Sequence, residues 1–326
     1  MARRPFIILL ALILFAPGAL FFALSVGSVA INAEDFIAVV LGQGDALHSQ
    51  IITQLRLPRA LAAFTCGGLL ALAGVLMQAL LRNPLADPYI LGISGGAAVA
   101  TLIAIMLGLG GLLLTGSAVL GALLSMTLVF SLAHGQGSWT PTRLLLTGVV
   151  VASGWGAIIS FLLAIAPQKN LHSMLFWLMG DLSYAKTYWP GIISLGVGLL
   201  GSLMISRNLN VLLQGDLQAH ALGVNVTRLR LSIYFIASLL TATAVTIAGS
   251  IGFIGLIIPH LLRLLGINDH RLLLPCAVLL GGTLLVIADT AARIIIAPQQ
   301  LPVGVITAMM GVPVFLFLMQ RSSRHP

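Results

Sequence analysis

Apolar stretches of about 20 residues recur along this chain, and each is long enough to cross a bilayer core as an α-helix. Only 7% of its 326 residues are charged, whereas a soluble domain has roughly a quarter. A membrane β-barrel would need short segments of alternating polarity, which the sequence lacks. The pattern predicts an all-α membrane protein that crosses the bilayer many times.

About ten transmembrane helices are predicted. Their approximate bounds are residues 6–27, 60–81, 89–109, 112–133, 143–165, 190–206, 229–249, 251–265, 272–292 and 301–320. Residues 169–189 are rich in aromatic side chains, which favours a position at the membrane interface. We treat residues 1–326 as a single transmembrane domain and expect two inverted five-helix halves, an arrangement that recurs in transporters.

The N-terminal stretch has two interpretations. Basic residues precede the apolar segment, as in a cleaved signal peptide. The apolar segment is longer than about 20 residues and contains only weak cleavage signals, so we expect it to be retained as the first span.

Lysine and arginine indicate the orientation. With ten spans and an inner N-terminus, eleven of the sixteen basic residues fall on the cytoplasmic side, which agrees with the positive-inside rule. The five on the outer side are Arg56, Arg59, Lys169, Lys186 and Arg293. We therefore expect both termini in the cytoplasm.

A polar segment, residues 214–224 (QGDLQAHALGV), interrupts the apolar pattern between the sixth and seventh spans. Asp216 is a good helix N-cap, because its carboxylate can accept from a free N–H of the first turn. Gly223 suits the position just after the helix, where positive φ is required. We predict a short cytoplasmic helix here that serves as a contact surface.

Missing motifs exclude several classes of function. The only lysines, Lys169 and Lys186, do not follow glycine, so the chain has no phosphate-binding GxxxxGK[ST] loop and does not hydrolyse ATP itself. The seven histidines form no zinc-binding spacing, and no GxSxG is present, so we expect neither a metal site nor an enzyme. Cys66 and Cys276 lie in apolar segments and are expected to be buried free thiols. The net charge of +8 comes without a basic run, which argues against nucleic acid as a partner.

Two alternative functions fit the sequence less well. An ion-coupled carrier needs ionisable groups at membrane depth, and the candidate is Asp289, which has Arg293 one turn later. A local ion pair near the end of a span is the simpler interpretation of these two residues. A membrane sensor or scaffold would carry a soluble domain, and the longest polar pieces are too short for one.

The chain resembles the permease subunits of ABC importers for ferric siderophores, vitamin B12 and haem. The motifs that carry the resemblance cover nearly the whole chain in the family's order. They are QLRLPRALAA, ALAGVLMQALLRNPLADPYILGISGGA, TRLLLTGV, GDLQAHALGV, GSIGFIGLIIPHLLRLLG, DHRLLLP, ADTAAR and LPVGVITAMMGVPVFL. The resemblance implies the fold of a type II ABC importer permease.

The resemblance also implies partners. Permeases of this family form a homodimer around a central pathway, bind two cytoplasmic ATPase subunits and receive ligand from a periplasmic or lipid-anchored binding protein. ATP and magnesium would then bind to the ATPase, and no cofactor to this chain. The location implied is the inner membrane of a bacterium.

Three sets of residues match functional positions of the family. The coupling helix, which contacts the ATPase, corresponds to Gly215, Asp216, Ala219, Leu222 and Gly223. Docking of the binding protein corresponds to Arg56, Arg59 and Arg293, whose planar guanidinium groups suit acidic residues. The cytoplasmic gate corresponds to Asn83, Leu85, Pro141 and Thr142. For the transported ligand we expect an iron complex, with vitamin B12 and haem as alternatives that no residue separates.

Overall fold

The computed structural model describes residues 3–27, 29, 31–134, 140–183, 185 and 187–322, so Lys186 lies outside the described residues. The described chain folds into helices. In chain order they are α1 (Arg3–Ser25), α2 (Ala33–Val40), α3 (Ala46–Gln50), the π-helix η1 (Ile51–Arg56), α4 (Leu57–Leu81), the 3₁₀-helix η2 (Pro88–Leu91), α5 (Ile93–Met106), α6 (Leu112–Ala133), α7 (Pro141–Ile165), α8 (Gln168–Leu178), α9 (Trp189–Met204), α10 (Ser206–Leu212), α11 (Asp216–Ala221), α12 (Val226–Ala248), α13 (Ile254–Leu264), α14 (His270–Ile294) and α15 (Val303–Ser322).

Each predicted span coincides with an apolar helix, which confirms the all-α membrane fold. In the part of the chain that is described, six helical segments are long and apolar enough to cross a bilayer. They are Pro5–Ser25, Ala46–Leu81, Leu112–Ala133, Pro141–Ile165, Val226–Ala248 and His270–Ile294. α9 and α10 form a further span that bends by 58°, and the shorter helices α5, α13 and α15 match the remaining predictions.

The boundaries differ from the prediction where the backbone breaks. α5 and α13 start later than expected because each follows a left-handed residue, Gly92 (φ 69°) or Phe253 (φ 71°), which hydropathy does not detect. The second span starts earlier, since α3 and η1 continue into α4 as one helical run of 36 residues. The short helix α2 was not predicted.

α4 is the central helix of the bundle. It packs against α14, α12, α13 and α9. In the most apolar 18-residue stretch of the helical segment Ala46–Leu81, 89% of the residues are buried. Glycine allows α4 and α14 to approach closely, because a Cβ on Gly67 of α4 would collide with the carbonyl oxygen of Gly281 on α14. This contact agrees with the packing role of small residues between membrane helices.

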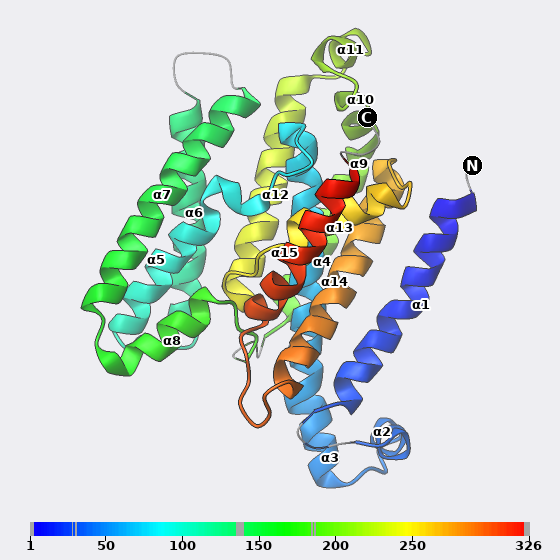
Figure 1. Ribbon diagram of the computed structural model, residues 1–326, viewed down its shortest axis with the longest axis vertical. Helices are drawn as coiled ribbons and strands as arrows, with labels where there is room; N and C mark the ends of the chain where they lie inside the picture. Colours follow the sequence, from blue (N-terminus) through cyan, green and yellow to red (C-terminus); the bar gives the residue numbers. More distant parts are fainter. Residues whose placement is uncertain are drawn as a thin grey trace.

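The two ends of the bundle carry different elements (Figure 1). α11 projects at one end, where α1 begins and α15 ends. α2 and α3 project at the opposite end, and α8 lies toward that end as well. This arrangement agrees with the predicted topology, in which residues 214–224 and both termini share one side of the membrane.

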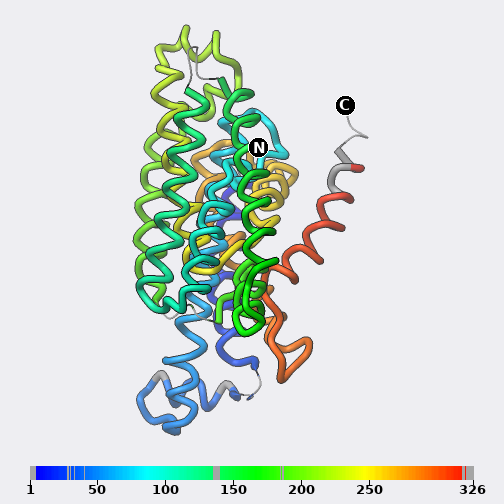
Figure 2. The backbone as a smooth tube through the Cα atoms, turned by 90° about the vertical axis from the view of Figure 1, so that its left-hand side faces the viewer, coloured from blue at the N-terminus to red at the C-terminus, as the bar shows by residue number. Residues whose placement is uncertain are grey.

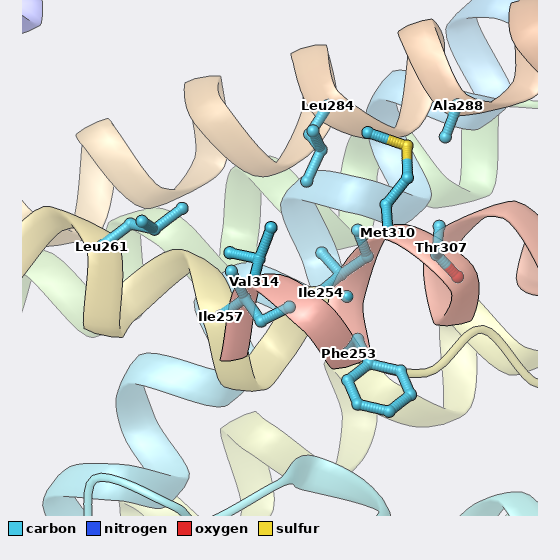
Figure 3. A pocket seen from close by; sticks show the side chains of 10 residues that line it. Phe253, Ile254, Ile257, Leu261, Leu284, Ala288, Thr307, Met310 and Val314 are labelled. Atoms are coloured by element: carbon cyan, nitrogen blue, oxygen red, sulfur yellow. The ribbon is translucent and has the colours of Figure 1, made fainter. Parts of the chain in front are cut away.

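α15 leans away from the rest of the bundle toward its C-terminal end (Figure 2). It packs against α14 and α13. These three helices border a small apolar cavity of about 110 Å³ (Figure 3). Phe253 lies at its edge, close to Thr307 and Met310 of α15 (Figure 3).

Candidate functional site

The polar segment forms a helix, as predicted, but its start differs. Gly215 is the N-cap residue, with φ 121°, and Asp216 is the first residue of α11, so the prediction of Asp216 as the cap was wrong. The C-terminal prediction is confirmed, because Gly223 has φ 78°. Its N–H donates to the His220 carbonyl at 2.9 Å, and the Val224 N–H donates to the Ala219 carbonyl at 2.9 Å. These two bonds form a Schellman motif that fixes the end of the helix.

The carboxylate of Asp216 joins α11 to two membrane helices. Arg230 of α12 donates from Nη2 to both oxygens, at 2.7 Å to Oδ2 and 3.0 Å to Oδ1. Arg82, which caps the C-terminus of α4, donates to Oδ1. Because one carboxylate binds both guanidinium groups, α11 cannot move far without moving the ends of α4 and α12 or breaking these ion pairs.

A second set of hydrogen bonds ties the preceding helix, α10, to the start of α14. The Asn210 amide donates to Asp269 Oδ1 at 2.7 Å. Its carbonyl oxygen accepts from the His270 backbone N–H at 3.0 Å and lies 2.7 Å from His270 Nδ1. The segment formed by α10 and α11 is therefore attached to three spans: α4, α12 and α14.

Two leucines are exposed at α11, Leu217 within the helix and Leu222 at its C-cap. Leu217 is 89% exposed and Leu222 is 65% exposed. The predicted contact residue Ala219 is instead fully buried, since it faces the chain itself and packs in the core. Gly215 and Gly223 shape the two ends of the helix. Leu217 was not predicted as a contact residue, although an apolar side chain in a polar cytoplasmic segment is a signal for one.

The outer arginines meet at the opposite end of the bundle. Arg59 of α4 donates to Asp289 of α14 from Nε at 3.0 Å and from Nη2 at 2.9 Å. Arg293 lies on the other side, with Nε 3.3 Å from Asp289 Oδ2. The Asp289 side chain is only 2% exposed. The predicted pair of Asp289 and Arg293 is confirmed, and Arg59 is an additional partner that sequence analysis missed.

Arg56, the third arginine of this set, bonds to the backbone at the end of α1. It is buried and donates from Nη1 to the carbonyl oxygens of Leu24 at 2.6 Å and Ser25 at 3.0 Å, at the C-terminus of α1. It also donates to the Val29 carbonyl. Its guanidinium therefore satisfies carbonyl groups that a helix end leaves free.

A cavity of about 340 Å³ opens beside these arginines. Arg56, Arg59 and Arg293 all line it, together with Gln300, whose side-chain oxygen accepts from Arg59 Nη1 at 2.7 Å. Three guanidinium groups and one carboxylate leave an excess of two positive charges here. The cavity therefore retains an attraction for acidic groups, although each arginine already has a partner within the chain.

α4 ends and α7 begins at the end of the bundle that carries α11 (Figure 1), and the predicted gate residues follow α4 or start α7. Asn83 Oδ1 accepts from the Leu85 N–H at 2.9 Å, which stabilises a tight turn after α4. Pro141 is the first residue of α7, and Thr142 follows it. The role of Asn83, Leu85, Pro141 and Thr142 as a gate stays a prediction.

Neither cysteine nor histidine forms a metal site among the described residues. Cys66 and Cys276 are buried free thiols, as expected. No group of three or more His, Cys, Asp or Glu side chains comes together in the described parts of the chain.

Comparison with known proteins assigns the chain to a family. A family model described as the FecCD transport family matches residues 10–321. The chain belongs to the FecCD transport family. It is 42% identical to the hemin transport system permease protein HmuU of Yersinia pestis, over 82% of each chain. It is 41% identical to the cobalamin import system permease protein BtuC of Halobacterium salinarum, over 83% of this chain and 73% of that one.

A solved structure gives the same assignment for the fold. This FecCD chain is similar to a metal-chelate type ABC transporter in an inward-facing conformation, with a TM-score of 0.86 and 33% identity over 96% of this chain and 99% of that one. The chain is therefore a multi-pass membrane permease of the ABC importer type, and its family is one of transport subunits.

Proposed function

We propose that this chain is the permease subunit of a bacterial importer for a ferric siderophore or related iron complex. The structure of α11 supports energy coupling. The helix is capped, exposes Leu217 and Leu222, and is joined to α4 and α12 through Asp216. A partner that binds this face would move the attached spans together with α11.

The energy source in this proposal is a separate ATPase, which binds ATP and magnesium. Two ATPase subunits contact α11 of a permease homodimer. Leu217 joins Leu222, Gly215, Asp216 and Gly223 as the residues that form the contact or shape it. The homodimer is supported by the exposure of α7. Only 11% of the residues in its most apolar 18-residue stretch are buried within one subunit, which leaves a face that a second subunit could cover.

A periplasmic or lipid-anchored binding protein delivers the ligand in this proposal. The cavity lined by three arginines supports an acidic docking partner, because its net positive charge attracts carboxylates. Arg59 and Arg293 contribute to the potential of this surface while they remain paired with Asp289. Arg56 acts mainly through the position of α1, to which it is bound.

The orientation proposed is that of an inner-membrane protein with both termini in the cytoplasm. α1 begins and α15 ends at the α11 end, where the ATPase would bind (Figure 1). The iron complex is supported by the likeness to a metal-chelate type transporter. The relatives named for cobalamin and hemin supply the two competing ligands.

Uptake by the reconstituted complex tests the proposal. The permease, its ATPase and its binding protein are placed in proteoliposomes, and labelled ferric siderophore, cobalamin and haem are offered separately. We expect ATP-dependent uptake of the ferric siderophore, and none with an ATPase that cannot hydrolyse ATP. Preferential uptake of cobalamin or haem would mean that this compound, and not the ferric siderophore, is the transported ligand. Uptake driven by a proton or sodium gradient without ATP would contradict the coupling role of α11.

A further inference from the structure

Two segments that separate α-helices meet inside the bundle. The first, residues 82–92, connects α4 to α5 and includes η2. The second, residues 249–253, separates α12 from α13. They are joined by Tyr89, whose hydroxyl oxygen accepts from the Ile251 backbone N–H at 3.0 Å. Ile251 is buried, so this bond gives a partner to a backbone donor inside the protein.

Both segments begin or end at a strained residue. Among the described residues other than glycine, positive φ occurs at Arg82 (φ 49°) and Phe253 (φ 71°). A left-handed conformation is unfavourable for a residue with a Cβ, and it persists where surrounding contacts hold it. Arg82 opens the first segment and Phe253 closes the second. Strain of this kind often occurs in segments that change conformation.

Each strained residue has a contact with a different helix. Arg82 donates to Asp216 of α11. Phe253 packs against α15, where a Cβ on Gly311 would meet the Phe253 side chain, and it borders the cavity shown in Figure 3. The hydrogen bond between Tyr89 and Ile251 joins the segment that begins at Arg82 to the segment that ends at Phe253. Asp87 orients Tyr89, because its Oδ1 accepts from the Tyr89 backbone N–H at 2.8 Å.

We propose that Tyr89 is a positioning residue that transmits movement of α11 to the break between α12 and α13. Displacement of α11 pulls on Arg82 and hence on residues 82–92. The Tyr89 hydroxyl then carries this movement to Ile251 and, through Phe253, to α15. This inference rests on the coupling role proposed for α11, and it names the contact by which that role reaches the membrane interior.

Tyr89→Phe tests this contact, because it removes the hydroxyl and keeps the ring. In the reconstituted complex, we expect uptake per ATP hydrolysed to fall roughly fivefold or more, which corresponds to the loss of a buried hydrogen bond. ATP hydrolysis and the amount of folded permease should change little. A purely structural role would instead lower the folded amount and leave uptake per ATP unchanged.

Tyr234→Phe is the matched control. Tyr234 is fully buried, whereas Tyr89 is partly buried, and the Tyr234 hydroxyl donates to the Met126 carbonyl at 2.7 Å. This bond joins α12 to α6 and includes no residue of either segment, 82–92 or 249–253. We expect uptake per ATP to stay at the wild-type value in this variant. An equal loss in both tyrosine variants would overturn the proposal, because it would show that any buried hydroxyl has the same effect.

A double variant tests whether Tyr89 and Arg82 act in series. If they do, Arg82→Gln combined with Tyr89→Phe should reduce uptake per ATP no further than the stronger single variant. Losses that multiply would overturn the proposal, as would wild-type coupling in Tyr89→Phe. If the wild-type complex shows no ATP-dependent uptake, the proposed function fails first and the inference fails with it.

Discussion

The carboxylate of Asp289 binds the guanidinium of Arg59 across the interface of α14 and α4, with Arg59 Nη2 2.9 Å from Oδ1, although 230 positions separate the two residues in the sequence. Arg293 approaches the same carboxylate from its own helix, with Nε 3.3 Å from Oδ2. Only 2% of the Asp289 side chain is exposed. This carboxyl group therefore serves the packing of α4 against α14, at the end of the bundle opposite α11.

Asp289→Asn should destabilise the permease strongly. The change leaves Arg59 and Arg293 close together without a counter-ion, and removal of one partner from a buried ion pair costs about 3–5 kcal/mol. Thermal unfolding in detergent measures the loss. Asp45→Asn is the control, because Asp45 is exposed on the same side of the membrane and has no ion pair among the described residues. Equal stability of the two variants would contradict a structural role for the Asp289 carboxylate.

Arg56→Ala should loosen the C-terminal end of α1. The arginine donates to the carbonyl groups of Leu24 and Ser25, and loss of a hydrogen-bond partner costs a buried polar group about 1–3 kcal/mol. Hydrogen exchange should become faster in the last turn of α1, and binding of the delivery protein should weaken through this change. If binding weakens while exchange in α1 stays at the wild-type rate, Arg56 contacts the partner directly, as the resemblance implied.

Gly67→Ala should destabilise the contact between α4 and α14. The added Cβ would collide with the carbonyl oxygen of Gly281, and overpacking of this kind costs about 1–3 kcal/mol. Gly196→Ala on α9 is the control, because no atom lies within 4 Å of its added Cβ. There the change should be neutral or stabilising by about 0.5–1 kcal/mol, since alanine favours the helix. Thermal unfolding of the two variants should therefore shift in opposite directions.

Asp87 should make stability depend on pH. Burial raises the pKa of its carboxyl from 3.8 to about 6, against the opposing effect of the hydrogen bond from the Tyr89 N–H. The folded state then holds the proton more tightly than the unfolded state, so stability falls as the pH rises from about 4 to 6 and is constant above that range. The shift corresponds to about 3 kcal/mol.

Asp87→Asn tests this dependence, because asparagine keeps the acceptor for the Tyr89 N–H and cannot ionise. We expect the variant to unfold at a similar temperature to the wild type near pH 4 and at a higher temperature at pH 7. If the unfolding temperatures of the two proteins differ by the same amount at pH 4 and at pH 7, Asp87 is freely hydrated in the folded state.

Hydropathy was sufficient to predict the spans, because the bilayer sets a minimum length for an apolar helix. The end of α11 was also predictable, since Gly223 is a local signal for a left-handed C-terminus. The ion pairs between residues far apart in the sequence were not predictable. Asp216 and Arg82 are 134 positions apart, so their contact depends on how α4 and α11 pack. The inward direction of Ala219 depends on packing for the same reason.

The resemblance implied a docking role for three arginines but did not predict their contacts within the chain. It implied that Arg56, Arg59 and Arg293 are available to a partner. The fold instead pairs two of them with Asp289 and places Arg56 on the end of α1. Buried cations need a partner within the chain before any outside partner arrives, and a motif match does not contain that information.

Gly223→Val should uncouple ATP hydrolysis from transport. A β-branched residue is strained at φ 78°, so the Schellman motif that ends α11 should open. Gly266→Val is the matched control, because Gly266 follows α13 with φ 90° and also has no atom within 4 Å of an added Cβ. Both variants should lose a similar amount of stability. Uptake per ATP should fall in Gly223→Val and stay at the wild-type value in Gly266→Val; an equal fall in both would mean that backbone strain alone, and not the position of α11, is responsible.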